Sequence, residues 1–79
     1  MSTLETVRAK VAARAQAPVP DDVEASLFET GVIDSWGVME LVSDLEETFG
    51  VKVPDEDLIP RKFETLGRIA DYFDAKTGR

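Results

Sequence analysis

The stretch that decides the fold runs from Leu27 to Leu41 and reads LFETGVIDSWGVMEL. It contains a turn residue, Gly31, followed by the pair Asp34-Ser35 and then at once by an amphipathic helical pattern. Asp34 is well placed to cap that helix, because an aspartate at the N-cap accepts a hydrogen bond from the first turn. The Ser35 hydroxyl would then lie free and exposed at the helix N-terminus, where unpaired N–H groups and the positive dipole end favour a phosphate group.

Helical patterns on both sides of this stretch predict an all-α fold. The buried face of the central helix is expected to consist of Val38, Leu41, Val42, Leu45 and Phe49. Capping signals at Ser2, paired with Glu5, and at Thr65 mark the starts of the two flanking helices. We therefore expect one domain over residues 1–79, a four-helix bundle with three main helices, one short helix and a long loop between the first two. The expected helices cover residues 3–15, 35–49, 55–59 and 65–76.

The connecting segments carry their own signals. Gly50 stands where a left-handed C-terminal cap favours glycine. Leu27 and Phe28 lie in the long loop and are expected to reach the core. Asp55 is expected to begin the short helix, which Pro60 would end. The phenylalanines are all assigned to the core; they are Phe28, Phe49, Phe63 and Phe73.

The composition limits what the chain can do. It has 79 residues, a hydrophobic fraction of 43%, no cysteine and no histidine. Disulfides, zinc sites built on Cys or His, and Cys or His nucleophiles are therefore excluded. No apolar run approaches the roughly 20 residues of a membrane span, so we expect a cytoplasmic protein, and we expect it to be a monomer.

Negative charge is concentrated in the middle of the chain. The net charge is −7, and residues 21–57 contain twelve acidic side chains against a single basic one, Lys52. Such an anionic centre argues against nucleic acid as a partner and favours a cationic protein surface. A simpler interpretation, that the acidity only confers solubility, stays open.

The Asp-Ser pair has simpler interpretations as well. Either residue can serve only as a helix cap. Ser35 as a catalytic nucleophile would need an activating base, and the chain has no histidine, so we do not expect an enzyme. The run Asp55-Glu56-Asp57 lacks the spacing and central glycine of an EF-hand, so we predict no metal site there or elsewhere.

Taken together, these features resemble the acyl carrier protein family. The resemblance rests on the stretch from Leu27 to Phe49 with its Asp-Ser pair, on Gly50-Val51 and Pro54 after it, and on the last helix. That last helix is matched through Phe63-Glu64-Thr65-Leu66, Ile69 and Tyr72. The resemblance covers roughly residues 4 to 75. There are two departures: Trp36 replaces the usual leucine or other aliphatic residue, and Val32 and Ile33 both stand between Gly31 and Asp34, where one residue is usual. The form Leu-Phe-Glu-Thr-Gly-x-x-Asp-Ser looks more like D-alanyl carrier proteins and other free-standing carriers of specialised pathways.

The resemblance implies a covalent cofactor and a non-catalytic role. A phosphopantetheinyl transferase would attach 4′-phosphopantetheine to Ser35, beside Asp34. The terminal thiol of the arm would carry an acyl or aminoacyl group as a thioester, which agrees with a chain that has no cysteine of its own. The further partner would be an acyl or aminoacyl ligase, synthase or transferase with a basic docking surface. The sequence does not decide between a fatty acyl, a polyketide and an aminoacyl cargo.

One face of the central helix is a candidate docking surface. Steps of 100° place Trp36, Glu40, Ser43 and Glu47 opposite the buried stripe, with Met39 and Asp44 flanking them. In the family this helix resembles the element that docks on partner enzymes, and an exposed aromatic and a methionine are favoured at adaptable interfaces. The face could instead be a merely solvated one, and Trp36 could fold back onto the connector near Val32 and Ile33. An alternative for the whole protein is a small acidic helical adaptor that binds a basic partner without any cofactor.

Overall fold

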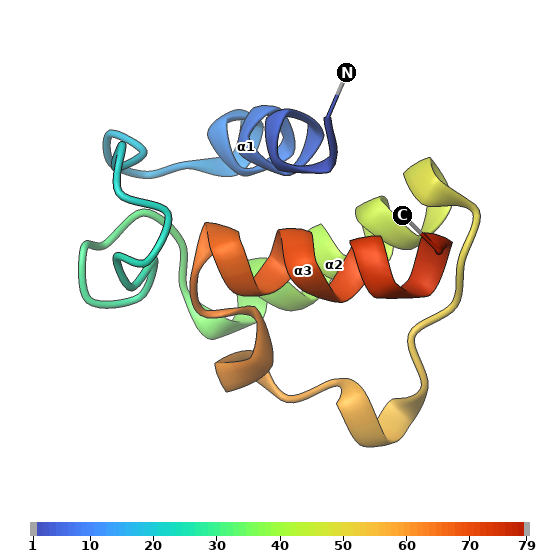
Figure 1. Ribbon diagram of the computed structural model, residues 1–79. Coiled ribbons are helices and arrows are strands. Elements are labelled where there is room, and N and C mark those ends of the chain that lie inside the picture. Colours follow the sequence, from blue (N-terminus) through green and yellow to red (C-terminus); the bar gives the residue numbers. More distant parts are fainter. Residues whose placement is uncertain (1, 79) are drawn as a thin grey trace.

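The computed structural model describes residues 2–78, and every regular element in that range is helical (Figure 1). Three α-helices and two short 3₁₀ helices follow one another along the chain. They are α1 (Thr3–Arg14), α2 (Ser35–Phe49), η1 (Asp55–Asp57), η2 (Pro60–Phe63) and α3 (Leu66–Thr77). The all-α carrier-type fold expected from the sequence is therefore confirmed.

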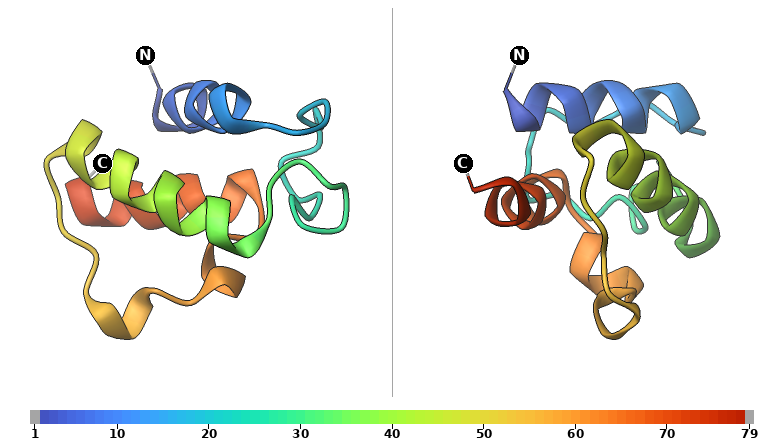
Figure 2. Two further views of the ribbon diagram at one scale, coloured as in Figure 1. Left: turned by 180° about the vertical axis from the view of Figure 1, so that it is seen from behind. Right: turned by 90° about the vertical axis from the view of Figure 1, so that its right-hand side faces the viewer.

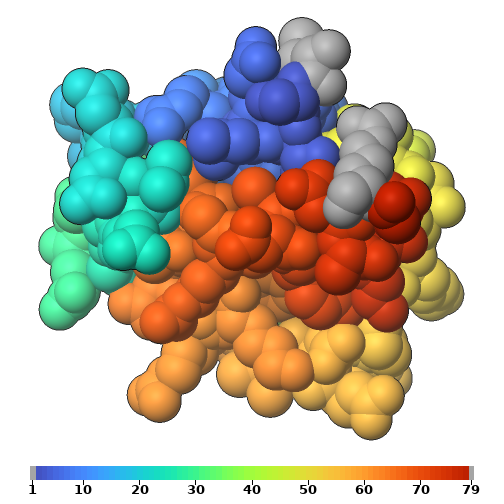
Figure 3. All heavy atoms as spheres, viewed as in Figure 1, coloured from blue at the N-terminus to red at the C-terminus, as the bar shows by residue number. Residues whose placement is uncertain are grey.

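Helices α2 and α3 are held together mainly by elements that lie on either side of them. Helix α1 contacts both α2 and α3, and so does the short helix η2. The views in Figures 1 and 2 show α1 above this pair and η2 below it. In the space-filling view, residues of α3 fill the face between α1 and the η1–η2 segment (Figure 3). The two bracketing elements thus close the core from opposite sides.

The core is a single apolar cluster. Helix α2 contributes the predicted stripe, of which Val38, Leu41, Val42 and Leu45 are fully buried. From the other elements come Val7, Val11, Leu27, Val32, Ile33, Val53, Phe63, Leu66, Ile69, Ala70 and Phe73. Burial of one such large side chain contributes about 1.5–3 kcal/mol. No covalent crosslink is possible in a chain without cysteine, so this cluster holds the fold.

The expected helix over residues 55–59 is wrong. The segment forms two 3₁₀ turns, and Pro60 begins the second of them instead of ending a helix. The backbone leaves the helical region at Leu58, at φ −78° and ψ 63°, and is extended at Ile59, at φ −116° and ψ 120°. A residue that precedes proline is disfavoured in the helical region, so a helix starting at Asp55 cannot continue through this position.

The other boundaries and caps follow the sequence signals closely. Ser2, Asp34 and Thr65 each accept a backbone N–H from the first turn of the helix that they cap. Gly50 adopts the left-handed conformation at the end of α2, with φ 67°. Helix α1 ends at Arg14, one residue earlier than expected, and α3 ends one residue later. Phe28 and Phe49 are only half-buried at the edge of the core.

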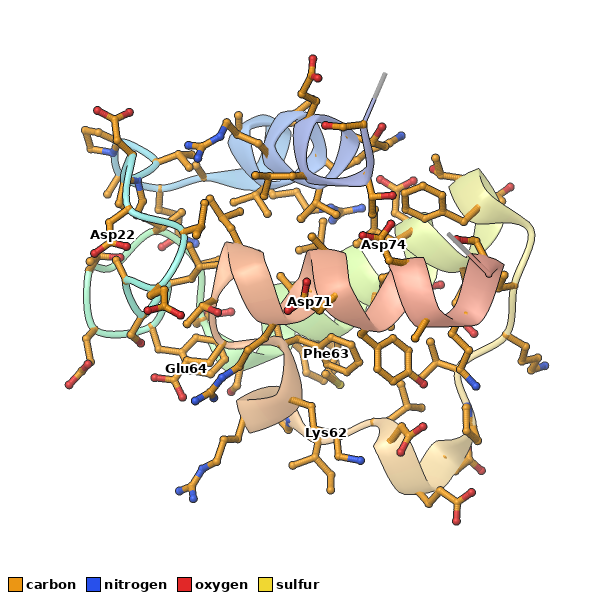
Figure 4. All side chains as sticks on the ribbon, in the orientation of Figure 1. Asp22, Lys62, Phe63, Glu64, Asp71 and Asp74 are labelled. Carbon is orange, nitrogen blue, oxygen red and sulfur yellow. The ribbon has the colours of Figure 1, made fainter. Side chains whose placement is uncertain are left out.

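Side-chain contacts attach the outer elements to α3. Thr3 at the start of α1 donates a hydrogen bond to Asp74, which projects from α3 towards α1 (Figure 4). Below α3, the Tyr72 hydroxyl donates to the Asp57 carboxylate at 2.8 Å, and Lys62 Nζ donates to the same carboxylate at 2.7 Å. These bonds connect η1 and η2 with the last helix.

The Asp57 contacts shift two pKa values in opposite directions. Hydrogen bonds from Lys62 and then Tyr72 lower the pKa of Asp57 below its ordinary 3.8. Burial, together with the bond to Asp57, raises the pKa of Tyr72 to about 12. Because the folded state favours protonated Tyr72, its contribution to stability is complete below pH 10 and is lost as the pH rises towards 12. The contribution of Asp57 to stability has the opposite pH dependence. It is complete above pH 3.8 and is lost as the pH falls through the lowered pKa.

Titration of Tyr72, the only tyrosine, tests this arrangement. Tyrosinate absorbance in the folded protein should rise near pH 12. In Asp57→Asn the midpoint should move down towards 10, because the negative charge beside the hydroxyl is gone. Asp55→Asn removes an exposed neighbouring carboxylate that does not contact Tyr72 and should leave the midpoint unchanged. A wild-type midpoint at the ordinary value would contradict the described contact.

Candidate functional site

The Asp34 side chain caps α2 as its sequence position predicts. Its Oδ1 accepts the Gly37 N–H at 2.7 Å, and its backbone carbonyl accepts the Val38 N–H at 2.9 Å. Loss of an N-cap aspartate typically costs about 0.5–2 kcal/mol. The carboxylate of Asp34 is thus engaged with the helix that it begins.

Ser35 is the first residue of α2, and its side chain is exposed. Within residues 2–78 its hydroxyl makes no hydrogen bond, because the neighbouring Asp34 does the capping. The backbone N–H groups of Ser35 and Trp36 belong to the first turn, where a helix offers them no internal partner. An accessible hydroxyl beside unpaired donors and the positive end of a helix dipole fits a phosphodiester.

The connector that presents this serine is fixed by backbone hydrogen bonds. Leu27 C=O accepts both the Val32 N–H at 3.0 Å and the Ile33 N–H at 3.2 Å. Val32 C=O in turn accepts the Gln16 N–H at 2.8 Å. The turn between them needs Gly31, whose φ is 73°. The position of Ser35 is therefore set by the loop before it as well as by the helix after it.

Gly37 allows the connector to pack directly on the first turn of α2. A Cβ atom at this position would lie 2.8 Å from Cγ1 of Ile33, closer than side-chain atoms approach. Ile33 is almost fully buried and branched at Cβ, so it has little room to move. A glycine two residues after Ser35 thus contributes to the site through packing, a role that the sequence analysis did not assign.

The predicted docking residues divide into two groups. Trp36 is 76% exposed, and Glu40, Ser43 and Glu47 are exposed along the same face of α2. The alternative in which Trp36 folds back onto Val32 and Ile33 is therefore wrong. Met39 and Asp44, at the margin of this face, are half-buried, and the Met39 side chain packs against the core.

Asp44 is paired within the molecule. Its carboxylate lies 3.3 Å from Lys10 Nζ and 3.7 Å from an Arg14 guanidinium nitrogen, so α1 neutralises it in place. Exposed ion pairs of this kind typically contribute only about 0–1 kcal/mol. The pairing still changes the charge of the candidate docking surface. Glu40 and Glu47 are the carboxylates of this surface that have no ion pair among the described residues, and Arg14 lies at its border. The i,i+4 spacing of Lys10 and Arg14 places both cations on one face of α1 but does not indicate their partner on α2.

Two surface hollows border these features, and a third lies where η2 meets α3. One of about 420 Å³ lies over the docking surface and is lined by Arg14, Glu40, Ser43, Asp44 and Glu47. One of about 340 Å³ lies beside Ser35 and is lined by Gln16, Phe28, Gly31, Ile33, Asp34 and Ser35. One of about 660 Å³, missed by the sequence analysis, is lined by Ile59, Arg61, Lys62, Arg68, Asp71 and Tyr72.

Comparison with known sequences identifies the family. The sequence model of the family described as "Phosphopantetheine attachment site" matches residues 5–73. This match spans most of the chain, and the chain therefore belongs to that family, the acyl carrier proteins. As a member, it carries covalently attached 4′-phosphopantetheine, and the exposed hydroxyl and free donors at the start of α2 fit that group.

Individual relatives point the same way. A D-alanyl carrier protein of Streptococcus equi subsp. zooepidemicus is 35% identical over 69 residues, which cover 87% of both chains. A D-alanyl carrier protein of Streptococcus pyogenes is 37% identical over 51 residues, 65% of each chain. The acyl carrier protein of Thermotoga maritima is 44% identical over 55 residues, 70% of this chain and 65% of that one. No solved structure matches significantly.

The similarity to D-alanyl carrier proteins that the sequence suggested is thus confirmed. An acidic adaptor without a cofactor, the alternative raised from the sequence, does not hold. Among the described helices, none combines the length and apolar character needed to cross a bilayer.

Trp36 is the only tryptophan, so its fluorescence reports its environment. Because the indole is exposed and is not part of the hollow beside Ser35, emission should be red-shifted and open to acrylamide quenching. The emission should stay nearly unchanged when apo protein is converted to holo protein and should shift when a partner enzyme binds. Blue-shifted, quencher-protected emission in the apo form would contradict the described position.

Proposed function

We propose that Ser35 carries the phosphopantetheine arm and that the protein presents acyl or aminoacyl groups to partner enzymes as thioesters. The observation that supports this most directly is the free, exposed Ser35 hydroxyl at a helix terminus that Asp34 caps. When bound, the arm supplies a thiol that the chain itself lacks. The protein's own contribution is to hold the attachment point, to place unpaired N–H groups beside the phosphate, and to offer a docking helix.

The proposed role is non-catalytic. The chain has no histidine or cysteine, and the adjacent Asp34 carboxylate is engaged in capping α2. Its partners would be a phosphopantetheinyl transferase and a loading ligase, synthase or transferase with a basic docking surface. The D-alanyl carrier relatives favour a free-standing carrier in a specialised biosynthetic pathway, with an aminoacyl group as the first cargo to test.

Attachment is tested by modification in vitro. Incubation with coenzyme A and a broad-specificity phosphopantetheinyl transferase should add one phosphopantetheine, and peptide mapping should place it on Ser35. Ser35→Ala should remain helical and lose all labelling. Ser2→Ala, which removes an exposed serine outside α2 and outside the candidate docking surface, is the control and should be labelled like wild type. Labelling of Ser26, whose hydroxyl is bonded to Glu64 at 2.6 Å, would overturn the assignment.

Docking is tested by charge reversal. Glu40→Lys and Glu47→Lys should slow loading by roughly tenfold at low salt, because exposed charges of complementary sign steer association. The difference should shrink at higher salt, where screening acts within about 8–10 Å. Glu29→Lys, which reverses an exposed charge outside the docking surface, should load at nearly the wild-type rate. Equal rates for all three variants would show that the acidic face serves solubility alone.

Asp44 should behave differently from its two neighbours. Because Lys10 and Arg14 already neutralise it, Asp44→Asn should change loading less than Glu47→Lys does. The same substitution should lower the free energy of unfolding slightly, by about 0–1 kcal/mol. Loading rates and denaturant unfolding of both variants provide the comparison.

A further inference from the structure

The hollow beside Ser35 has a wall that is mainly apolar on the connector side. Phe28 is half-buried and Ile33 is almost fully buried, and both line it together with Gly31 and Ser35. Since Ser35 forms part of the wall, any group attached to its hydroxyl begins at the edge of this hollow. Gln16 and Asp34 complete the lining. The Gln16 side-chain amide makes no hydrogen bond within the described part of the chain, whereas Oδ1 of Asp34 accepts the Gly37 N–H.

This wall is preformed. The Gln16 N–H is bonded to Val32 C=O at 2.8 Å, and the Gly31 N–H is bonded to Phe28 C=O at 3.1 Å. The connector that carries Phe28 and Ile33 is thus closed by backbone hydrogen bonds without any ligand. A preorganised site binds at a lower entropic cost than one that must be ordered first.

The chemistry of the wall matches the part of the arm nearest to the serine. After the phosphodiester, phosphopantetheine has a carbon with two methyl groups, then a hydroxyl and an amide. The methyl groups are apolar and suit Phe28 and Ile33, whereas the hydroxyl and the amide suit the Gln16 side chain, which both donates and accepts. The phosphodiester itself suits the free N–H groups at the start of α2.

We propose that the root of the arm lies in this hollow, with its methyl groups against Phe28 and Ile33 and its polar atoms towards Gln16. The proposal rests on the attachment to Ser35 proposed above. A volume of about 340 Å³ is near the lower end of the roughly 300–1,000 Å³ of small-molecule sites. The hollow is therefore large enough for the first part of the arm.

The two other hollows suit the root of the arm less well. The hollow over the candidate docking surface is lined by Arg14, Glu40, Ser43, Asp44 and Glu47, and Ser35 is not among its lining residues. The largest hollow, around Tyr72 and Ile59, shares no residue with the lining beside Ser35.

Spectra of the apo and holo proteins locate the arm. After mass spectrometry has verified that Ser35 is modified, amide chemical-shift differences should concentrate on Gln16, Phe28, Gly31 and Ile33. Methyl groups of an isotopically labelled arm should show nuclear Overhauser contacts to the Phe28 ring. Differences confined to residues 35–37 would mean an arm free in solution, and differences centred on Ile59 and Tyr72 would place it elsewhere; either result overturns the proposal. Absence of modification at Ser35 would instead overturn the proposed function.

Matched variants give a second readout that does not depend on a loading enzyme. If the root is bound, holo protein should melt at a higher temperature than apo protein, since a group that binds only the folded state stabilises it. Phe28→Ala should abolish this holo-minus-apo difference. Phe49→Ala removes another half-buried phenylalanine, one stacked on Phe73, and should lower both melting temperatures while preserving the difference.

Gln16→Glu keeps the test decisive if Phe28→Ala does not fold. Gln16 is exposed, so the apo protein should melt as wild type does, whereas the new carboxylate beside the phosphodiester should reduce the holo-minus-apo difference. A difference that survives unchanged in both Phe28→Ala and Gln16→Glu would overturn the proposal.

Discussion

The hydrogen bond from the Gly37 N–H to the Asp34 carboxylate determines which of two adjacent polar residues is free to react. A serine at the N-cap would turn its hydroxyl into the helix, where the first-turn donors would occupy it. With Asp34 in that position, Ser35 moves to the first helical residue and its hydroxyl faces outward. The buried Ile33 side chain, packed against Gly37, holds the same turn from below. The exposure of Ser35, the proposed attachment point, thus depends on one cap and one close contact.

Much of the fold could be predicted from local signals. The stripe from Val38 to Leu45 specified the buried face of α2, and the caps at Asp34, Gly50 and Thr65 specified where helices begin and end, because each acts within one turn of its own helix. The expected helix after Asp55 was wrong, although its cause was local too: Ile59 precedes Pro60, and this conflict outweighs a favourable acidic start.

The candidate site was predictable only where it, too, depends on local sequence signals. Exposure of Trp36 follows from its angle on the helix, since that angle depends only on residue spacing. The pairing of Asp44 with Lys10 and Arg14 depends on how α1 crosses α2, which no spacing within α2 contains. The hollow beside Ser35 likewise arises from a loop that folds back, so Gln16 and Phe28 join the site through tertiary structure alone.

Because Ser35 and the candidate docking carboxylates lie on the same helix, α2 fixes the distance between them. Glu47 is the twelfth residue after Ser35, and a rise of 1.5 Å per residue makes that distance about 18 Å along the axis. If the proposed docking holds, an enzyme that binds Glu47 through a basic residue would meet the attachment serine about 18 Å further along the helix axis. Enzymes of unrelated folds that serve this carrier would share that one spacing on their surfaces, even where they share nothing else.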